Sequence, residues 1–125
     1  MKKILIVDDE KDFCFFVKAN LELSSEYKVT VATNGKEGIR AAETHQPDLI
    51  LLDVMMPGMD GIDVLKILKE NKRTIDIPVL MLTAKGDEET KMQAATSYNE
   101  GYIVKPVAIN DLKGKIEEAL SRFGK

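Results

Sequence analysis

Short apolar runs alternate with amphipathic stretches along this chain. The runs consist mainly of Val, Ile and Leu, as at 49–52 and 79–82. Near-continuous apolar runs of this length are typical of parallel strands that are covered on both faces. Five runs therefore predict strands, at 3–7, 28–32, 49–52, 79–82 and 102–104.

The stretches between these runs predict helices, because their apolar residues recur every three to four positions. The first stripe is formed by Phe13, Phe16, Val17 and Leu21. The last stripe is formed by Ile109, Leu112, Ile116, Leu120 and Phe123. Weaker patterns predict helices at 36–44, 62–70 and 87–97, and two of these have capping residues before them, Asn34 and Asp60.

The alternation of strand and helix predicts an α/β fold, a doubly wound five-stranded parallel sheet with helices on both faces. In a flavodoxin-like (βα)5 sheet with strand order 2-1-3-4-5, ligands bind beyond the carboxyl ends of the first and third strands, at the topological switch point. The length of 125 residues is that of one domain. We expect a single domain over residues 1–125, without an output domain.

Three acids stand directly behind predicted strands. Asp8 and Asp9 follow the first apolar run, and Asp53 follows the third. A carboxylate beside an apolar core must be hydrated, paired or bound to a metal. Acids from two strands that meet at one sheet edge repel one another unless a cation lies among them. Oxygen ligands suit a hard divalent ion, so the acids predict a Mg²⁺ site.

Asp53 is also a candidate carboxylate nucleophile of the kind that forms an acyl phosphate. The turn at 54–61 separates it from the next helix and leaves it outside capping range. An equally good interpretation of the first acids is that Asp9 caps the first helix and that Asp8 and Glu10 interact favourably with the helix dipole. Asp53 is the residue that favours a functional site over that structural role.

Two further strand ends carry polar groups. Thr83 ends the fourth run, where its hydroxyl can donate to a phosphoryl oxygen, and the small Ala84 leaves the approach open. Lys105 ends the fifth run and precedes Pro106, which restricts its backbone. Each residue alone fits a turn or a surface position. Together with the acids, Thr83 and Lys105 put polar or charged side chains at the ends of the first, third, fourth and fifth predicted strands.

Composition excludes several other classes of protein. The net charge of −3 gives no electrostatic footprint for nucleic acid. The single cysteine, Cys14, cannot form an internal disulfide, and no apolar run reaches the length of a membrane span. We therefore expect a cytoplasmic protein with neither nucleic acid nor membrane as its partner.

With these residues in place, the chain resembles the receiver domains of two-component response regulators, the family of the chemotaxis protein CheY. The resemblance covers essentially the full length. It is carried by Val7-Asp8-Asp9-Glu10, Pro47-Asp48-Leu49-Ile50-Leu51-Leu52-Asp53, Met56-Pro57-Gly58-Met59-Asp60-Gly61, Pro78-Val79-Leu80-Met81-Leu82-Thr83-Ala84 and Lys105-Pro106.

The resemblance implies that Asp53 is the phosphoacceptor, supplied by a sensor histidine kinase or a histidine phosphotransfer protein. It implies a Mg²⁺ site formed by Asp8, Asp9, Asp53 and the backbone carbonyl of Met55. The protein would catalyse only its own phosphorylation and dephosphorylation, so it is not expected to be an enzyme acting on an outside substrate.

The resemblance also implies how phosphorylation is read out. Thr83, Ala84 and Lys105 would contact the phosphate, Tyr102 would swing inward, and the peptide bond before Pro106 would be cis. The partner would bind the face formed by the fourth helix, the fifth strand and the fifth helix. The domain would be a monomer or a weak dimer. Tyr98-Asn99, Gly101 and Val107 depart from the usual family pattern and lie near that face.

Other functions predict other residues. A magnesium phosphatase with an aspartyl nucleophile needs Asp-x-Asp after the first strand, whereas Asp8 and Asp9 are adjacent. An FMN-binding protein needs an anion-friendly loop there, and Asp-Asp-Glu is the opposite. A pseudo-receiver that binds partners without phosphorylation typically lacks a site residue. We expect a stand-alone receiver; the alternatives are a pseudo-receiver and a receiver segment of a larger regulator.

Overall fold

The computed structural model describes residues 1–84 and 101–122. The elements within them are β1 (Lys2–Val7), α1 (Lys11–Glu22), β2 (Tyr27–Ala32), α2 (Gly35–His45), β3 (Leu49–Asp53), α3 (Gly61–Glu70), β4 (Val79–Ala84), β5 (Tyr102–Lys105) and α5 (Ile109–Arg122). The predicted elements among these residues are confirmed, with bounds shifted by at most one or two residues where bounds were predicted. The helix expected at 87–97 lies outside the described residues.

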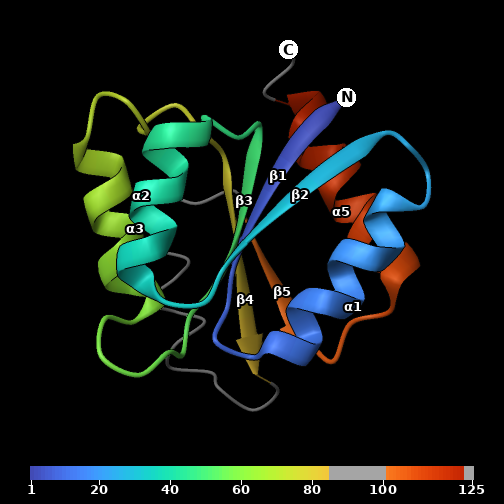
Figure 1. Cartoon of the computed structure of the whole chain (residues 1–125), viewed down its shortest axis with the longest axis horizontal. Helices are drawn as coiled ribbons and strands as arrows, with labels where there is room; N and C mark the ends of the chain where they lie inside the picture. Colours follow the sequence, from blue (N-terminus) through green and yellow to red (C-terminus); the bar gives the residue numbers. More distant parts are fainter. Residues whose placement is uncertain (85–100, 123–125) are drawn as a thin grey trace.

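The strands of the described residues form one five-stranded parallel sheet in the order β2-β1-β3-β4-β5 (Figure 1). This is the predicted order. Val7, the last residue of β1, lies opposite Ala32 on one side and Leu52 on the other. Because all strands run the same way, their carboxyl ends meet at a single edge of the sheet.

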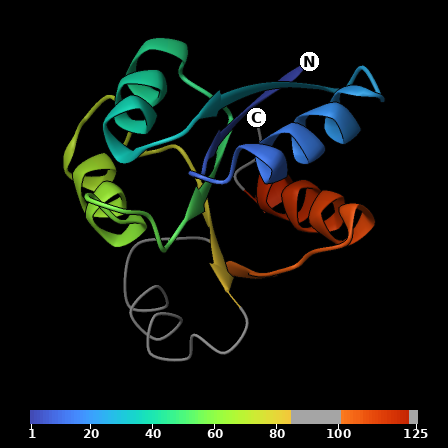
Figure 2. The same ribbon diagram turned by 60° about the horizontal axis from the view of Figure 1, so that its bottom comes forward.

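Two helices cover each face of the sheet among the described residues. Helices α1 and α5 lie together on one face, and α2 and α3 lie on the other (Figures 1 and 2). Side chains of the central strands alternate between the two resulting cores, with Ile4 and Ile6 in the first and Leu5 and Val7 in the second. Burial on both faces explains why the strand sequences are almost continuously apolar.

Helix α1 turns three of the four residues of its predicted apolar stripe to the core, and Phe16 is the exception. Cys14, Val17 and Leu21 are buried, and Phe13 packs against them, but Phe16 is 47% exposed. At about 100° per residue, Phe16 lies more than about 100° around the helix from the centre of the buried residues. The assignment of Phe16 to the core was therefore wrong. Cys14, which was not part of the predicted stripe, is buried in the core instead.

The starts of α2 and α3 are fixed by side-chain caps. Asn34 Oδ1 accepts a hydrogen bond of 2.9 Å from the backbone N–H of Glu37. Asp60 Oδ1 accepts one of the same length from the N–H of Asp63. Both predicted caps are confirmed, and each satisfies a backbone donor that the first helical turn leaves unpaired. Among the described residues, no helix has the length and apolar character needed to cross a bilayer.

Candidate functional site

The strand ends bring the predicted site residues to one edge of the sheet. Asp8 directly follows β1, and Asp53 is the last residue of β3. In the ladder, Asp53 lies opposite Leu82, one residue before Thr83. Lys105, the last residue of β5, lies opposite Ala84. The parallel register therefore gathers two acids, a hydroxyl and a lysine from four strands.

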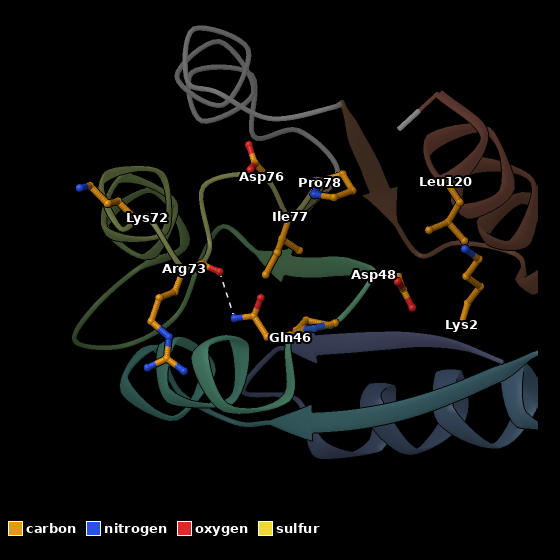
Figure 3. Close-up of a pocket in the computed structure, with 10 residues that line it drawn as sticks. Lys2, Gln46, Asp48, Lys72, Arg73, Asp76, Ile77, Pro78 and Leu120 are labelled. Atoms are coloured by element: carbon orange, nitrogen blue, oxygen red, sulfur yellow. Dashed lines mark hydrogen bonds between the residues drawn. The ribbon is translucent and has the colours of Figure 1, made fainter. Parts of the chain in front are cut away.

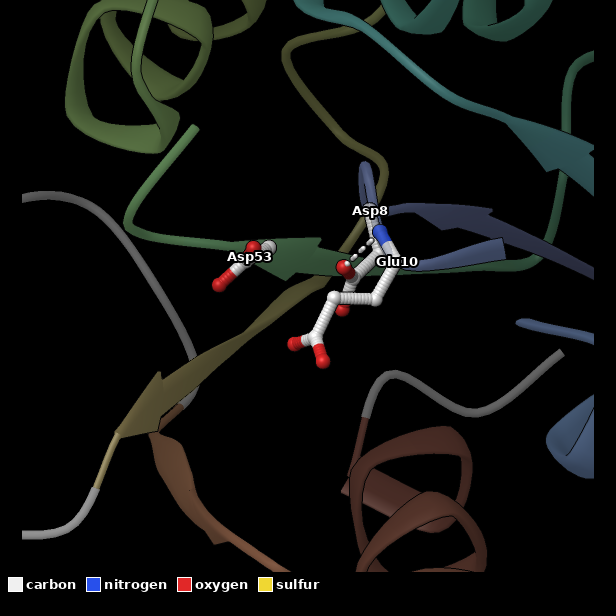
Figure 4. Close-up of side chains that lie close together, drawn as sticks. All are labelled: Asp8, Glu10 and Asp53. Carbon is white, nitrogen blue, oxygen red and sulfur yellow. Dashed lines mark hydrogen bonds between the residues drawn. The ribbon is translucent and has the colours of Figure 1, made fainter. Parts of the chain in front are cut away.

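The carboxylates that come together are those of Asp8, Glu10 and Asp53. Within the described part of the chain, one oxygen from each lies within 4.8 Å of the others, and Figure 4 shows the three side chains grouped beside the end of β3. Asp9, expected as a ligand, is exposed and is not a member of this group. Sequence reasoning assigned Glu10 only to the helix dipole. The signal for Glu10 was its place as the third of three consecutive acids.

Asp8 is fully buried, and only one of its two carboxylate oxygens accepts a hydrogen bond from the described residues. Its Oδ1 accepts a hydrogen bond of 2.9 Å from the backbone N–H of Glu10, which fixes the turn after β1. Its Oδ2 accepts no hydrogen bond from any described residue. Lys105 Nζ lies 2.6 Å from Oδ2 as an ion pair, in an orientation that does not satisfy hydrogen-bond angles. A buried carboxylate oxygen thus has charge compensation without a directed donor.

Lys105 is the central cation of the site. Its Nζ lies 2.7 Å from Glu10 Oε1 and 3.8 Å from Asp53 Oδ1, in addition to the pair with Asp8. The ammonium also lies 4.5 Å from the centre of the Phe13 ring, a cation–π distance. Burial alone would lower the pKa of Lys105, but Asp8 and Glu10 outweigh it and raise that pKa. The lysine therefore stays charged among the acids.

Asp53 is buried to 5% exposure, and burial is the main reason its pKa rises to about 7. The negative charge of Asp8 raises the pKa further, whereas Lys105 and the backbone N–H of Met55 lower it. That N–H donates a long hydrogen bond of 3.4 Å to Asp53 Oδ1. Close to neutral pH, Asp53 exchanges between its protonated and ionised forms, and a nearby cation favours the ionised form.

The loop after β3 is held tightly against Asp53 by Gly61. The N–H of Gly61 donates to the carbonyl of Val54 at 2.9 Å. A Cβ at position 61 would overlap the backbone oxygen of Asp53 and lie 2.8 Å from the Cα of Val54. Only a residue without a side chain fits here, so Gly61 fixes the place of Asp53. The sequence pattern gave Gly61 no such role.

The remaining predicted residues surround the acids. Thr83 is buried, and its hydroxyl has no hydrogen-bond partner among the described residues. Ala84 is exposed, as are Met55 at 58% and Tyr102 at 42%. The peptide bond between Lys105 and Pro106 is cis.

Thr83→Val is expected to raise the free energy of unfolding by about 1 kcal/mol, because a methyl group replaces a buried hydroxyl without a partner. Thr74→Val is the matched control. Thr74 is equally buried, but its Oγ1 donates to the Leu68 carbonyl at 2.7 Å, so this variant should lose about 1 kcal/mol. Urea unfolding measures both. A loss of the same size at both positions would contradict the unpaired state of the Thr83 hydroxyl.

A second concave region lies at the opposite end of the sheet (Figure 3). This cavity of 420 Å³ lies beside the amino ends of β1, β3 and β4, where Lys2, Asp48 and Pro78 line it. Gln46 Nε2 donates to the Arg73 carbonyl at 3.0 Å across its wall. Its lining carries both positive and negative side chains and none of the site residues described above. It is separate from the acidic site.

Solved receiver domains share this fold over nearly their whole length. A CheY-like receiver domain protein from Methanospirillum hungatei superposes with a TM-score of 0.89 and 30% identity, covering 98% of this chain and 96% of that one. The Vibrio cholerae chemotaxis protein CheY4 gives 0.88 and 30%, covering 96% and 99%. The receiver domain of a Francisella response regulator gives 0.87 and 34%, covering 99% and 100%.

Curated relatives are longer proteins. The alkaline phosphatase synthesis transcriptional regulatory protein PhoP of Bacillus subtilis is 41% identical over 97% of this chain, which is 49% of PhoP. The phosphate regulon transcriptional regulatory protein PhoB of Pseudomonas aeruginosa is 39% identical over 98% of this chain and 53% of PhoB. The chain spans about half the length of these relatives. The family model for the response regulator receiver domain matches residues 4–117. This chain therefore belongs to the family of response regulator receiver domains of two-component signalling.

Proposed function

We propose that Asp53 accepts a phosphoryl group from the phosphohistidine of a sensor histidine kinase or a histidine phosphotransfer protein. The observation that carries this proposal is the setting of Asp53. It is a buried carboxylate with a pKa raised to about 7, and it lies 3.8 Å from the ammonium of Lys105 at the switch point of the sheet. Membership of the receiver family supports the same assignment.

In the transfer, an oxygen of ionised Asp53 attacks phosphorus and the bond from phosphorus to the imidazole nitrogen breaks. The nitrogen keeps the electron pair, and an acyl phosphate forms. Lys105 can reach the phosphoryl oxygens, because its Nζ already lies 3.8 Å from Asp53. The protein contributes mainly position and charge neutralisation, since phosphoryl transfer asks for little covalent chemistry.

The site residues fit a Mg²⁺ ion. The donors are carboxylate oxygens, which magnesium prefers, and Asp8 Oδ2 is a buried acceptor without a hydrogen bond from the described residues. We propose Asp8, Asp53 and the Met55 carbonyl as ligands, with Asp9 turning inward from its exposed position. Such an ion would neutralise charge on Asp53 and on the phosphoryl oxygens.

We further propose that the phosphate is read by Thr83, Ala84 and Lys105. The Thr83 hydroxyl has no hydrogen-bond partner among the described residues, so it is available to donate to a phosphoryl oxygen. The exposed Ala84 leaves room beside it. Tyr102, 42% exposed, would turn inward as Thr83 moves. The downstream partner would then read β5 and α5, together with the helix expected at 87–97, which is outside the described residues.

In this proposal the domain is a switch that catalyses only its own phosphorylation and dephosphorylation. It would act in the cytoplasm as a monomer or weak dimer, and its own contacts would be with proteins. The expectation that this domain does not bind nucleic acid stays a prediction, because the relatives PhoP and PhoB are named as transcriptional regulatory proteins.

The decisive experiment is phosphorylation by a small donor. Incubation of the protein with acetyl phosphate or phosphoramidate and Mg²⁺ is expected to add one phosphoryl group, seen as an intact mass increase that EDTA prevents. Hydroxylamine should remove the group, because acyl phosphates react with it. A protein that binds Mg²⁺ but stays unmodified would contradict the proposal and favour a pseudo-receiver.

A second candidate is that this receiver is a segment of a longer regulator. The observation in its favour is that the chain covers about half of PhoP and PhoB. An antibody against the domain would distinguish the two cases in an immunoblot of the host cells. A band at 13.9 kDa supports a stand-alone receiver, and a band at about twice that mass, as the lengths of PhoP and PhoB suggest, supports the segment.

A further inference from the structure

The ammonium of Lys105 is held from one side by the segment that follows β1. Asp8 Oδ2 lies 2.6 Å from Lys105 Nζ and Glu10 Oε1 lies 2.7 Å from it, and the Phe13 ring centre lies at 4.5 Å. Asp8 belongs to the proposed metal site. Glu10 and Phe13 have no part in the phosphoryl transfer described above, yet they make two of the lysine's close contacts.

These contacts create a competition for Asp8. Its Oδ2 is the buried oxygen that lacks a hydrogen bond, and the ammonium of Lys105 lies 2.6 Å from it. A divalent cation and an ammonium cannot both take this position, because they would overlap and repel each other. When Asp8 ligates a cation, Lys105 must give up its shortest ion pair. Its remaining partners then decide where the ammonium goes.

We propose that Glu10 and Phe13 are positioning residues that hold the Lys105 ammonium beside Asp53 while Asp8 ligates the cation. The inference rests on the proposed function, since it supposes that a cation binds Asp8. Lys105 thereby remains poised for the phosphoryl group on Asp53 and does not turn out into solvent.

The geometry suits this role. Glu10 has a side chain that is 63% exposed, so its carboxylate can follow the ammonium over a short distance, whereas the buried Asp8 cannot. The start of α1 is anchored, because the N–H of Cys14 donates to the carbonyl of Glu10 at 3.1 Å. Phe13 packs against the core and presents its ring to the ammonium. The carboxylate of Glu10 and the aromatic ring of Phe13, both at the anchored start of α1, therefore hold the same ammonium group of Lys105.

Chemical labelling of Lys105 tests the proposal. The reaction of each lysine with an acylating reagent is measured by peptide mass spectrometry, with and without saturating Mg²⁺, with the exposed Lys115 as internal reference. In the wild type, Mg²⁺ should change Lys105 labelling by less than about twofold. In Glu10→Gln and in Phe13→Leu, Mg²⁺ should raise it by about three- to fivefold, because one of the two holding contacts is gone.

Two matched controls separate the holding contacts from general effects. Asp12→Asn removes the same charge as Glu10→Gln from an exposed position two residues further on, in the first turn of α1, and Phe16→Leu makes the same change as Phe13→Leu on an exposed ring. Both should behave like the wild type. Magnesium binding by each protein is measured separately by calorimetry, which also establishes saturation.

The outcomes are distinguishable. If the wild type binds Mg²⁺ and Mg²⁺ exposes Lys105 equally in the wild type and in Glu10→Gln, the holding role is wrong and the proposed function stands. The holding role is also wrong, and the proposed function also stands, if Mg²⁺ leaves Lys105 protected from labelling in both Glu10→Gln and Phe13→Leu. If the wild type binds no Mg²⁺, the metal site of the proposed function fails, and the inference fails with it.

Discussion

Asp53→Asn is expected to abolish the phosphoryl adduct and, at the same time, to stabilise the folded protein near pH 8. The adduct is lost because an amide cannot act as the nucleophile. Stability rises because the amide is neutral, so the cost of keeping a carboxylate buried beside Asp8 disappears. Intact mass after acetyl phosphate treatment and urea unfolding measure the two effects on the same sample.

The pH dependence of the stability difference follows from the direction of the pKa shift. Folding raises the pKa of Asp53 from 3.8 to about 7, so between these values the folded state binds more protons than the unfolded state. The contribution of Asp53 is therefore most favourable below pH 3.8, falls as the pH rises, and is lowest above about pH 7. The wild type and Asp53→Asn should be similar near pH 4.

At pH 8 the variant should be more stable by roughly 2–4 kcal/mol in EDTA, somewhat less than the roughly 4–5 kcal/mol that the full shift gives at about 1.4 kcal/mol per pH unit. Glu117→Gln, which removes one exposed acid from α5, is the control and should stay within about 0.5 kcal/mol of the wild type. A stability difference for Asp53→Asn that is the same at pH 4 and pH 8 would contradict the raised pKa. A persistent adduct would contradict Asp53 as phosphoacceptor.

The sequence was sufficient to predict the sheet and the place of its site. Near-continuous apolar strands alternating with amphipathic helices specify a parallel sheet, and in such a sheet the residues after each strand must meet at one edge. Asp8, Asp53, Thr83 and Lys105 were therefore brought together by topology alone. No side-chain geometry was needed for that step, because strand register sets it.

Contacts that depend on side-chain direction could not be predicted in this way. Lys105 is long enough to pass Asp53 and reach Asp8 and Glu10, and the choice among the three acids depends on burial and rotamer. The stripe on α1 identified the helix but placed Phe16 in the core, because an apolar residue at the border of a stripe fits either face. The first difference arises in the turn before α1, and the second arises in the middle of that helix.

Gly61→Ala is expected to destabilise the protein by about 3 kcal/mol or more and to slow phosphorylation of Asp53 sharply. The new Cβ would overlap the backbone oxygen of Asp53 and lie 2.8 Å from Val54 Cα. Neither neighbour is a flexible side chain. The strain can be relieved only by moving the end of β3 or the start of α3, so the cost should reach or exceed the upper end of the roughly 1–3 kcal/mol typical of overpacking. Asp53 then loses its alignment with Lys105.

The backbone around Gly61 leaves it little freedom to move. Its N–H is bonded to the Val54 carbonyl at 2.9 Å, and the preceding Asp60 caps α3 through the N–H of Asp63.

Gly114→Ala is the matched control, since no atom lies within 4 Å of its Cβ position on the exposed face of α5. That variant should gain about 0.5–1 kcal/mol from the higher helix propensity of alanine. Urea unfolding and the rate of adduct formation with acetyl phosphate measure both variants. If Gly61→Ala folds with wild-type stability and is phosphorylated at the wild-type rate, the close approach of α3 to Asp53 does not fix the phosphoacceptor.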